Sequence, residues 1–375
     1  MIPISKPFLS TEEAQSAYDT ILTGWVTQGP RVEEFEHEFA KLTGAKYAIA
    51  VSNCTTALHL SLIVAGITSG DEVICPSLSY IATANSIRYV GAKPVFAEVG
   101  NDYNLDVKDI ESRITENTKA ILLVHQMGMP ADIDEVKKIC NKYSLELIED
   151  AACAIGSSYK NKMIGSHSDL VCFSFHPRKV ITTGDGGMIT TNSKDYHNRL
   201  KKLRQHGMSV NDRIRHVSKK VIFEKYDELG YNYRLTDIQA SVGIQQLKKL
   251  NEIVHKRREI ASIYNNAFKN IQHIELPKDN IHTISNFQSY SVILKKHFPV
   301  KRNDLMQRLL DFGIATRKGI MLAHTEKAYS NINFKDLQHS EFLSNNSIIL
   351  PLYVPMNKSD IDFVIEMFIK IINEN

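Results

Sequence analysis

Residues 170–191 read LVCFSFHPRKVITTGDGGMITT. The apolar run 170–175 predicts a short buried strand, and 188–191 predicts the next strand along the chain. Between them, Pro177 restricts the backbone of one turn, and the glycines ahead of the second strand allow a tight loop. Lys179 therefore lies just past the end of a predicted strand.

The same texture extends outward from this stretch, from about residue 45 to 205. Several apolar runs are continuous rather than alternating, which is typical of strands covered on both faces. Alternation of strands and helices predicts an α/β fold, a three-layer sandwich with a mainly parallel sheet and right-handed crossovers. The predicted strands are 47–52, 72–75, 94–98, 119–124, 145–149, 170–175 and 188–191, and the predicted helices are 55–66, 80–91, 132–143 and 194–206.

The pattern changes beyond Gly230. A long helix is predicted over 236–268, with Thr236 or Asp237 as its N-cap. A smaller α+β domain is expected to follow it, built from a strand near 289–294 and helices near 302–312 and 358–373.

The predicted division places residues 1–245 in a large domain and 246–375 in a small C-terminal domain. The N-terminal residues are left open between the two domains. The polar segment 207–228 is predicted to be a loop.

The composition excludes several classes of function. A chain of 375 residues that is 43% hydrophobic can bury a full core, and a formal net charge of +3 gives no argument for binding nucleic acid or a membrane surface. No signal peptide or bilayer-spanning run is apparent. The cysteines and histidines show no metal-ligand spacing, so no metal is expected, and reduced thiols favour a cytoplasmic protein.

Ligands of parallel α/β sheets bind at the carboxyl ends of the strands, so the residues that follow each strand are the candidates. Cys54 and Thr55 follow the first predicted strand and begin a helix, where free N–H groups and hydroxyls can hold a phosphate. An ordinary helix N-cap is the alternative, and on this segment alone it is the better interpretation. Asp150 follows a buried strand, where a carboxylate needs a partner. It could cap residues 151–155 or hold a proton on a pyridine ring.

Lys179 has a surface charge as its simplest interpretation. In a partly desolvated pocket near cationic neighbours, however, its pKa is predicted to be lowered, so that the neutral amine can form a Schiff base. An anion cradle, a buried carboxylate and a lysine at three strand ends are together what pyridoxal 5'-phosphate (PLP) requires.

With these residues in view, the chain resembles the DegT/DnrJ/EryC1/StrS sugar aminotransferases, which have the aspartate aminotransferase fold (fold type I). The resemblance covers nearly the whole chain, and its most specific parts are the lysine segment and the GYNYRLTDIQASVG segment. It is carried by residues 25–40, 54–62, 76–85, 90–96, 125–134, 148–159, 173–191, 230–243 and 314–321.

The resemblance implies roles for individual residues. Lys179 would hold the cofactor as a Schiff base and move a proton, and Asp150 would pair with the pyridinium nitrogen. The other implied cofactor contacts are ring stacking by Tyr80, phosphate contacts from Cys54, Thr55 and Ser174, and a phosphate contact from Asn232 of the partner subunit. A homodimer with shared active sites follows from the last of these. Residues 25–31 and the region of Arg317 and His324 match the sugar pocket, and His125 could contact substrate or satisfy a loop.

Two positions depart from the family pattern. Cys54 stands where many relatives have glycine before the phosphate threonine, so close approach of the phosphate is in doubt there. Cys153 stands where many relatives have glutamine or histidine against the cofactor's phenolic oxygen, so this hydrogen bond is weakened or moved.

The implied reaction is transfer of an amino group, usually from L-glutamate, to a nucleotide-linked 4-keto-6-deoxy sugar. A smaller phosphorylated ketone or a cyclitol ketone is the alternative acceptor. Dehydratases of the family replace the lysine with histidine, so Lys179 disfavours that reaction. A nucleotide-binding protein without PLP is disfavoured because no GxGxxG or GxxxxGK loop follows the first strand. The sugar, its nucleotide, the carbon aminated and the stereochemistry are not encoded in these motifs.

Overall fold

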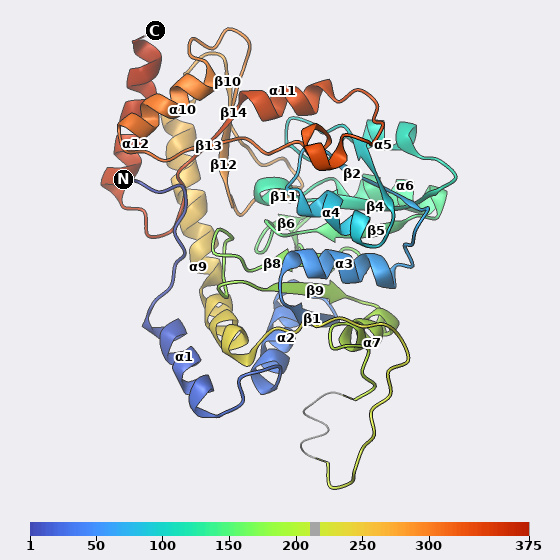
Figure 1. Ribbon diagram of the computed structural model, residues 1–375. Coiled ribbons are helices and arrows are strands. Elements are labelled where there is room, and N and C mark those ends of the chain that lie inside the picture. Colours follow the sequence, from blue (N-terminus) through green and yellow to red (C-terminus); the bar gives the residue numbers. More distant parts are fainter. Residues whose placement is uncertain (211–217, 375) are drawn as a thin grey trace.

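A computed structural model describes residues 1–210 and 218–374. Its centre is a seven-stranded sheet in the order β1-β9-β8-β5-β4-β2-β3 (Figure 1). Within it β9 runs antiparallel to both of its neighbours, and the other pairs are parallel, so the prediction of a mainly parallel sheet is confirmed. The bounds are β1 Tyr47–Val51, β2 Glu72–Pro76, β3 Lys93–Ala97, β4 Thr118–Val124, β5 Glu146–Asp150, β8 Val171–Ser174 and β9 Gly187–Thr191.

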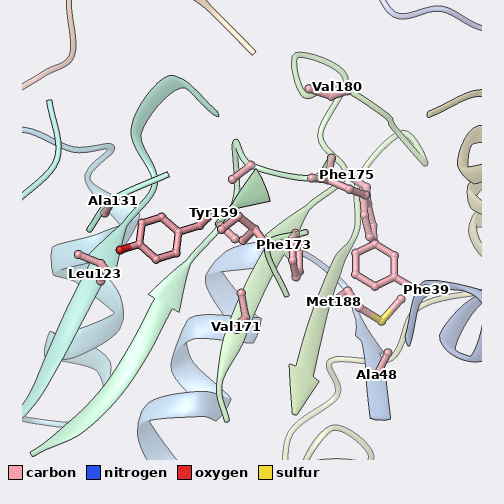
Figure 2. Close-up of a cluster of buried hydrophobic side chains, with 14 of the residues drawn as sticks. Phe39, Ala48, Leu123, Ala131, Tyr159, Val171, Phe173, Phe175, Val180 and Met188 are labelled. Carbon is pink, nitrogen blue, oxygen red and sulfur yellow. The ribbon is translucent and has the colours of Figure 1, made fainter. Parts of the chain in front are cut away.

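Helices cover both faces of this sheet and complete three layers (Figure 1). Successive strand residues enter opposite cores: Phe173 packs in one core and Cys172 in the other. Figure 2 shows part of the first core, in which the rings of Phe39, Phe173 and Phe175 lie together. That face is covered by α2 Pro30–Thr43, α5 Val107–Arg113, α6 Ile133–Tyr143 and part of α9, and the other face by α3 Cys54–Val64, α4 Ala82–Tyr89 and α7 Lys194–Leu203.

The long helix α9 (Asp237–Phe268) runs from this sandwich to the C-terminal part of the chain (Figure 1). Thr236 is its N-cap, and its hydroxyl accepts a hydrogen bond from the N–H of Gln239. The helix side chains as far as Ile253 pack in the core of the sandwich, and those from Ile260 onward pack in the C-terminal core. The predicted division at 245/246 therefore falls within one continuous helix, and it remains a prediction.

The C-terminal core surrounds a four-stranded antiparallel sheet in the order β10-β12-β14-β13. The chain's beginning also lies here, because Ile2 bridges to Ile314 and the carbonyl of Ile4 accepts a hydrogen bond from Leu352. The bounds are β10 Ile274–Glu275, β12 Tyr290–Leu294, β13 Arg317–Lys318, β14 Ser347–Leu350, α10 Arg302–Asp311, α11 Gln338–Asn346 and α12 Lys358–Asn373.

A third, small sheet joins the two parts of the molecule. In it β11 pairs with β6, which in turn pairs with β7. The bounds are β6 Ser158–Tyr159, β7 Lys162–Met163 and β11 Thr283–Ile284; α1 (Thr11–Leu22) packs on α9, and single 3-10 turns lie at η1 Gln126–Gly128, η2 Ala323–Thr325 and η3 Lys327–Tyr329.

The polar segment 207–228 has no helix or strand in its described parts, 207–210 and 218–228, where Met208 bridges to Tyr226. Residues 211–217 of the predicted loop lie outside the described residues. Across the described ranges, no helix combines the length and apolar character that a bilayer crossing requires.

Candidate active site

Lys179 lies on a loop that leaves the sheet after β8 and returns at β9. The loop is closed by hydrogen bonds from the N–H of Phe175 to the carbonyl of Gly186 at 2.8 Å and from the N–H of Thr183 to the carbonyl of Phe175 at 3.1 Å. Inside it, the N–H of Lys179 donates to the carbonyl of His176 at 2.8 Å. The lysine is thus anchored by its backbone, and its half-buried side chain points its Nζ at the Sγ of Cys153, 3.2 Å away.

Asp150 ends β5, the neighbour of β8, and its side chain is buried. One carboxylate oxygen accepts from the N–H of Ala152 at 3.1 Å, and the other accepts from the hydroxyl of Thr83 at 3.1 Å. The thiol of Cys54 lies 3.9 Å from the first oxygen. Burial raises the pKa of Asp150, against the hydrogen bond from Ala152 and the charge of Lys179, which lower it. A carboxylate of raised pKa binds a proton readily, and it is stabilised by a positively charged group beside it.

The third part of the site is the N-terminus of α3. Asn53 caps this helix by accepting the N–H of Thr56 at 2.9 Å, while the first N–H groups of a helix have no acceptor within it. Gly187 of β9 lies against this end, since an added Cβ would sit 2.8 Å from the N of Cys54. Ser174 pairs with Gly187 across β8 and β9, which brings its hydroxyl to the same edge.

These three parts form what we call the cofactor edge: Cys54, Thr55, Asp150, Ser174 and Lys179, at the ends of β1, β5 and β8. The structure brings these predicted residues together, with Cys153 beside the lysine. Tyr80 lies on the turn before α4, the helix that supplies Thr83 to Asp150, and its side chain is 67% exposed.

Asn232 makes no hydrogen bond to a cofactor-edge residue in the described part of the chain, although the carbonyl of its neighbour Tyr233 accepts the N–H of Ser52 at 2.9 Å. It is exposed, bridges to Gln205 at the end of α7, and its Oδ1 accepts from Arg234 at 3.1 Å. Within the described residues no contact joins it to Lys179 or Asp150.

His125 has a structural role in this fold. Its Nδ1 accepts the N–H of Ala131 at 3.0 Å, so Nε2 carries the proton and donates to Glu149 at 2.8 Å. Both side chains are fully buried. The open choice between substrate contact and loop is thereby resolved in favour of the loop.

Two regions matched to the sugar pocket are held by structural partners. Asp237 of α9 accepts the N–H groups of Gly29, Arg31 and Val32 at 2.7–3.1 Å, and so caps α2 beside segment 25–31. His324 is buried between Ser77 and Glu341, at 2.6 and 3.1 Å, whereas Arg317 is exposed.

The predicted pKa of Lys179 is wrong. Burial lowers the pKa, but the thiol of Cys153, which accepts its hydrogen bond, and the nearby Cys54 and Asp150 raise it above the ordinary value. Arg178, the cation adjacent in sequence, acts instead on His176 and Arg317, whose pKa values are lowered first by burial and then by its charge. Hydrogen-bonded to the thiol of Cys153, the amine keeps its proton in the cofactor-free pocket.

Sequence reasoning missed several residues that build the site. Thr83 reaches Asp150 across 67 positions of sequence, and Asn286 reaches the carbonyl of Cys153 across 133. Thr83 lies in an unremarkable helix start, and Asn286 lies in a polar turn of the C-terminal part. No local signal marks either residue.

A separate cavity of about 210 Å³ lies between the sandwich and the C-terminal part of the chain. Its walls come from the turns after β3 and β4 and from the segment that leads into β12, and none of the cofactor-edge residues lines it. Its lining includes Asp102, Tyr103, Met127, Ser285, Phe287 and Ser289.

The arrangement matches the demands of a pyridine aldehyde phosphate. A buried carboxylate of raised pKa suits a ring nitrogen, a lysine amine suits the aldehyde, and the α3 N-terminus with Ser174 suits a phosphate. Within residues 1–210 and 218–374, no group of three or more potential ligand side chains is placed to hold a metal. Fold and site together define a PLP-dependent aminotransferase, in which PLP is the cofactor.

Comparison with known proteins supplies the family. Residues 7–369 match the DegT/DnrJ/EryC1/StrS aminotransferase family, and the chain belongs to it. It is 35% identical to spore coat polysaccharide biosynthesis protein SpsC of Bacillus subtilis, over 97% of this chain and 95% of SpsC. It is also 35% identical to GDP-perosamine synthase of Escherichia coli O157:H7, over 97% of both chains.

A solved structure agrees in fold. A Streptococcus pneumoniae protein described as a sugar aminotransferase superposes in its pyridoxamine phosphate form with a TM-score of 0.94 over 100% of both chains, at 27% identity. Its PLP form is also solved. The protein is accordingly a sugar aminotransferase, and the implied fold type and cofactor are confirmed.

Proposed function

We propose that this protein transfers an amino group from L-glutamate to a nucleotide-linked keto sugar of the 4-keto-6-deoxy hexose type. The observation that carries the proposal is the meeting of Lys179 and Asp150 at one sheet edge, beside the open N-terminus of α3. The similarity to GDP-perosamine synthase supports a nucleotide-linked acceptor. A lysine at position 179, where dehydratases of the family carry histidine, supports transamination.

Each residue has a task in this proposal. When bound, PLP takes up the donor's amine and electrons in one half-reaction and returns them in the next. Lys179 holds it covalently and then moves protons at the reacting carbon, a task for which its amine must first lose the proton it keeps in the cofactor-free pocket. Asp150 stabilises positive charge on the ring nitrogen, and the N–H groups at Cys54 and Thr55, with the hydroxyl of Ser174, hold the phosphate.

The first test is chemical. Borohydride reduction of the PLP-loaded protein, followed by peptide mass spectrometry, should find a pyridoxyl group on Lys179. An adduct on another lysine, or none, overturns the proposal.

The second test concerns the substrates. A panel of a nucleotide-linked keto sugar, a phosphorylated ketone and a cyclitol ketone should give glutamate-dependent product with the first acceptor at the highest kcat/KM. Preference for either of the other ketones replaces the proposed acceptor. Loss of water without consumption of glutamate would instead indicate a dehydratase.

We also propose a homodimer in which Asn232 completes the partner's phosphate site. Its exposed side chain, which bonds to Arg234 and to none of the cofactor-edge residues of its own chain among the described residues, supports this assignment. The test is complementation: Lys179→Ala and Asn232→Ala proteins, each inactive alone, should regain activity when their subunits are mixed, since one site in each mixed dimer is intact. If both residues act within one chain, mixing restores nothing.

A cytoplasmic location completes the proposal. Within the described ranges the five cysteines are free thiols, which supports a reducing compartment.

A further inference from the structure

The segment between β11 and β12 crosses from the C-terminal part to the lysine loop. We call residues 285–289 the bridge. Its side chains alternate: Ser285, Phe287 and Ser289 line the 210 Å³ cavity, while Asn286 and Gln288 turn toward the cofactor edge. The bridge therefore contacts the backbone near Cys153 and Lys179 on one side, and it lines the cavity on the other.

Asn286 holds the turn after β5 that carries Cys153. Its fully buried side-chain amide donates to the carbonyls of Cys153 at 2.8 Å and Ile155 at 2.7 Å. The contact is close enough to require glycine opposite, because a Cβ at Gly128 would lie 1.9 Å from the Oδ1 of Asn286.

Gln288 holds the lysine loop. Its side-chain amide donates to the carbonyl of Arg178 at 2.9 Å, across 110 positions of sequence. Arg178 immediately precedes Lys179, so this bond fixes the peptide unit from which the lysine side chain leaves. The two side-chain amides of the bridge thus bond to the backbone at Cys153 and directly before Lys179. The side chains of these two residues meet at 3.2 Å.

A buried cation keeps the bridge in place. Arg257 of α9 donates from Nε to the carbonyl of Phe287 at 2.9 Å and from Nη2 to that of Gln288 at 2.5 Å. Burial lowers the pKa of Arg257 to about 10. The neighbouring Arg258 adds a hydrogen bond to the carbonyl of Ser285 at 2.5 Å and lies over the ring of Phe287, which packs in the C-terminal core. The bridge is therefore held by two arginines of α9 as well as by the packing of Phe287.

We infer that Asn286 and Gln288 are positioning residues for the reaction: through the backbone at Cys153 and Arg178 they set the distance and angle between the lysine amine and its thiol partner. This inference rests on the proposed role of Lys179. Neither side chain need touch the substrate. The bridge, from the C-terminal part of the chain, thereby affects the proton affinity and the orientation of Lys179.

The variants are Gln288→Leu and, in case that protein is poorly folded, Gln288→Met, which preserves length. The matched control is Gln307→Leu, which removes an exposed glutamine with one side-chain hydrogen bond, to Asp311 at 2.8 Å. Thermal unfolding confirms that each protein is folded.

The decisive readout uses cofactor-free protein: the pH dependence of acetylation of Lys179, followed by peptide mass spectrometry. Release of the loop should separate the amine from Cys153, so the midpoint should fall by about half a pH unit or more, as expected for losing part of one hydrogen bond. In the loaded enzyme, kcat should fall roughly tenfold with KM within about twofold, since misplacement acts on the reacting geometry.

Two failures are distinguishable. If the Gln288 variants match Gln307→Leu in both midpoint and kcat while borohydride still fixes a pyridoxyl group on Lys179, the inference is wrong and the proposed function stands. If wild-type protein fixes none on Lys179, the proposed function itself fails.

Discussion

The cofactor edge and the bridge serve the same lysine by different means. At the cofactor edge, Asp150 ends β5 and Lys179 lies on the loop after the neighbouring parallel strand β8, so strand pairing brings both to one edge of the sheet. The bridge reaches the same place from the C-terminal part of the chain, and depends on single hydrogen bonds over more than 100 residues of sequence.

The difference separates the residues that react from the residues that position them. The groups that react or carry charge lie at the ends of strands in one sheet or on the loop directly after one of them. The groups that adjust them come from a turn beside a cavity, where one lost hydrogen bond permits movement. Substitutions at the cofactor edge should therefore remove individual steps of the reaction. Substitutions at the bridge should change the reaction rate and the pKa of Lys179.

The largest effect is expected at the edge itself. Lys179→Ala removes the amine that holds the cofactor and moves the proton, so kcat should fall by at least about a thousandfold. Steady-state kinetics, with visible absorbance to confirm the loss of covalent PLP, measures it. A variant that turned over at the wild-type rate would remove the lysine from the mechanism.

Asp150→Asn should lower kcat by about a hundredfold, since the ring nitrogen loses its charged partner. The cofactor-free variant should nevertheless be more stable than wild type, because the folded carboxyl has a raised pKa and resists ionisation. Below the ordinary value of 3.8 the carboxyl is neutral in both states and the two proteins should unfold alike. As the pH rises above it, the unfolded wild type ionises first, so the stability advantage of the variant should grow.

Denaturant unfolding at several pH values tests that sign. A stability difference between wild type and Asp150→Asn that shrinks as pH rises would contradict it.

Arg257→Met tests the support of the bridge. It leaves the carbonyls of Phe287 and Gln288 without their buried donors, so the free energy of unfolding should fall by roughly 2 kcal/mol. The matched control is Arg308→Met: Arg308 lies on α10, away from the bridge, and its half-exposed side chain pairs with Glu374, so less than about 1 kcal/mol should be lost. Equal losses would mean that the buried cation has no special part in holding the bridge.

The smallest effect is expected where the two regions meet. Cys153→Ala removes the sulfur that accepts the hydrogen bond of the Lys179 amine, so the pKa of the lysine should fall in cofactor-free protein. Activity should stay within about threefold of wild type, because a single weak acceptor is lost. Acetylation of Lys179 as a function of pH provides the measurement, and a rise in its midpoint would show that Cys153 does not raise the proton affinity.

The sequence predicted the edge better than the bridge for a physical reason. Strand ends are visible as the last residue of an apolar run, and parallel pairing turns that local signal into spatial proximity, as for Asp150 and Lys179. The prediction for the pKa of Lys179 was wrong because this pKa depends on which neighbour faces the amine. Arg178 adjoins the lysine in sequence, yet Cys153 is the residue that accepts the hydrogen bond of its amine.

Sequence by itself determined the alternating α/β architecture, the cap at Thr236, the lysine with its carboxylate, and the family. These follow from apolar periodicity and from short motifs, both of which are local properties of a chain. The tertiary structure alone decided that His125 donates a hydrogen bond to Glu149 and that Thr83 donates one to Asp150. It also decided that Asn286 and Gln288 hold the backbone around Lys179. Such pairings depend on which surfaces meet after folding, and hydrogen bonds between distant residues leave no period or motif to read.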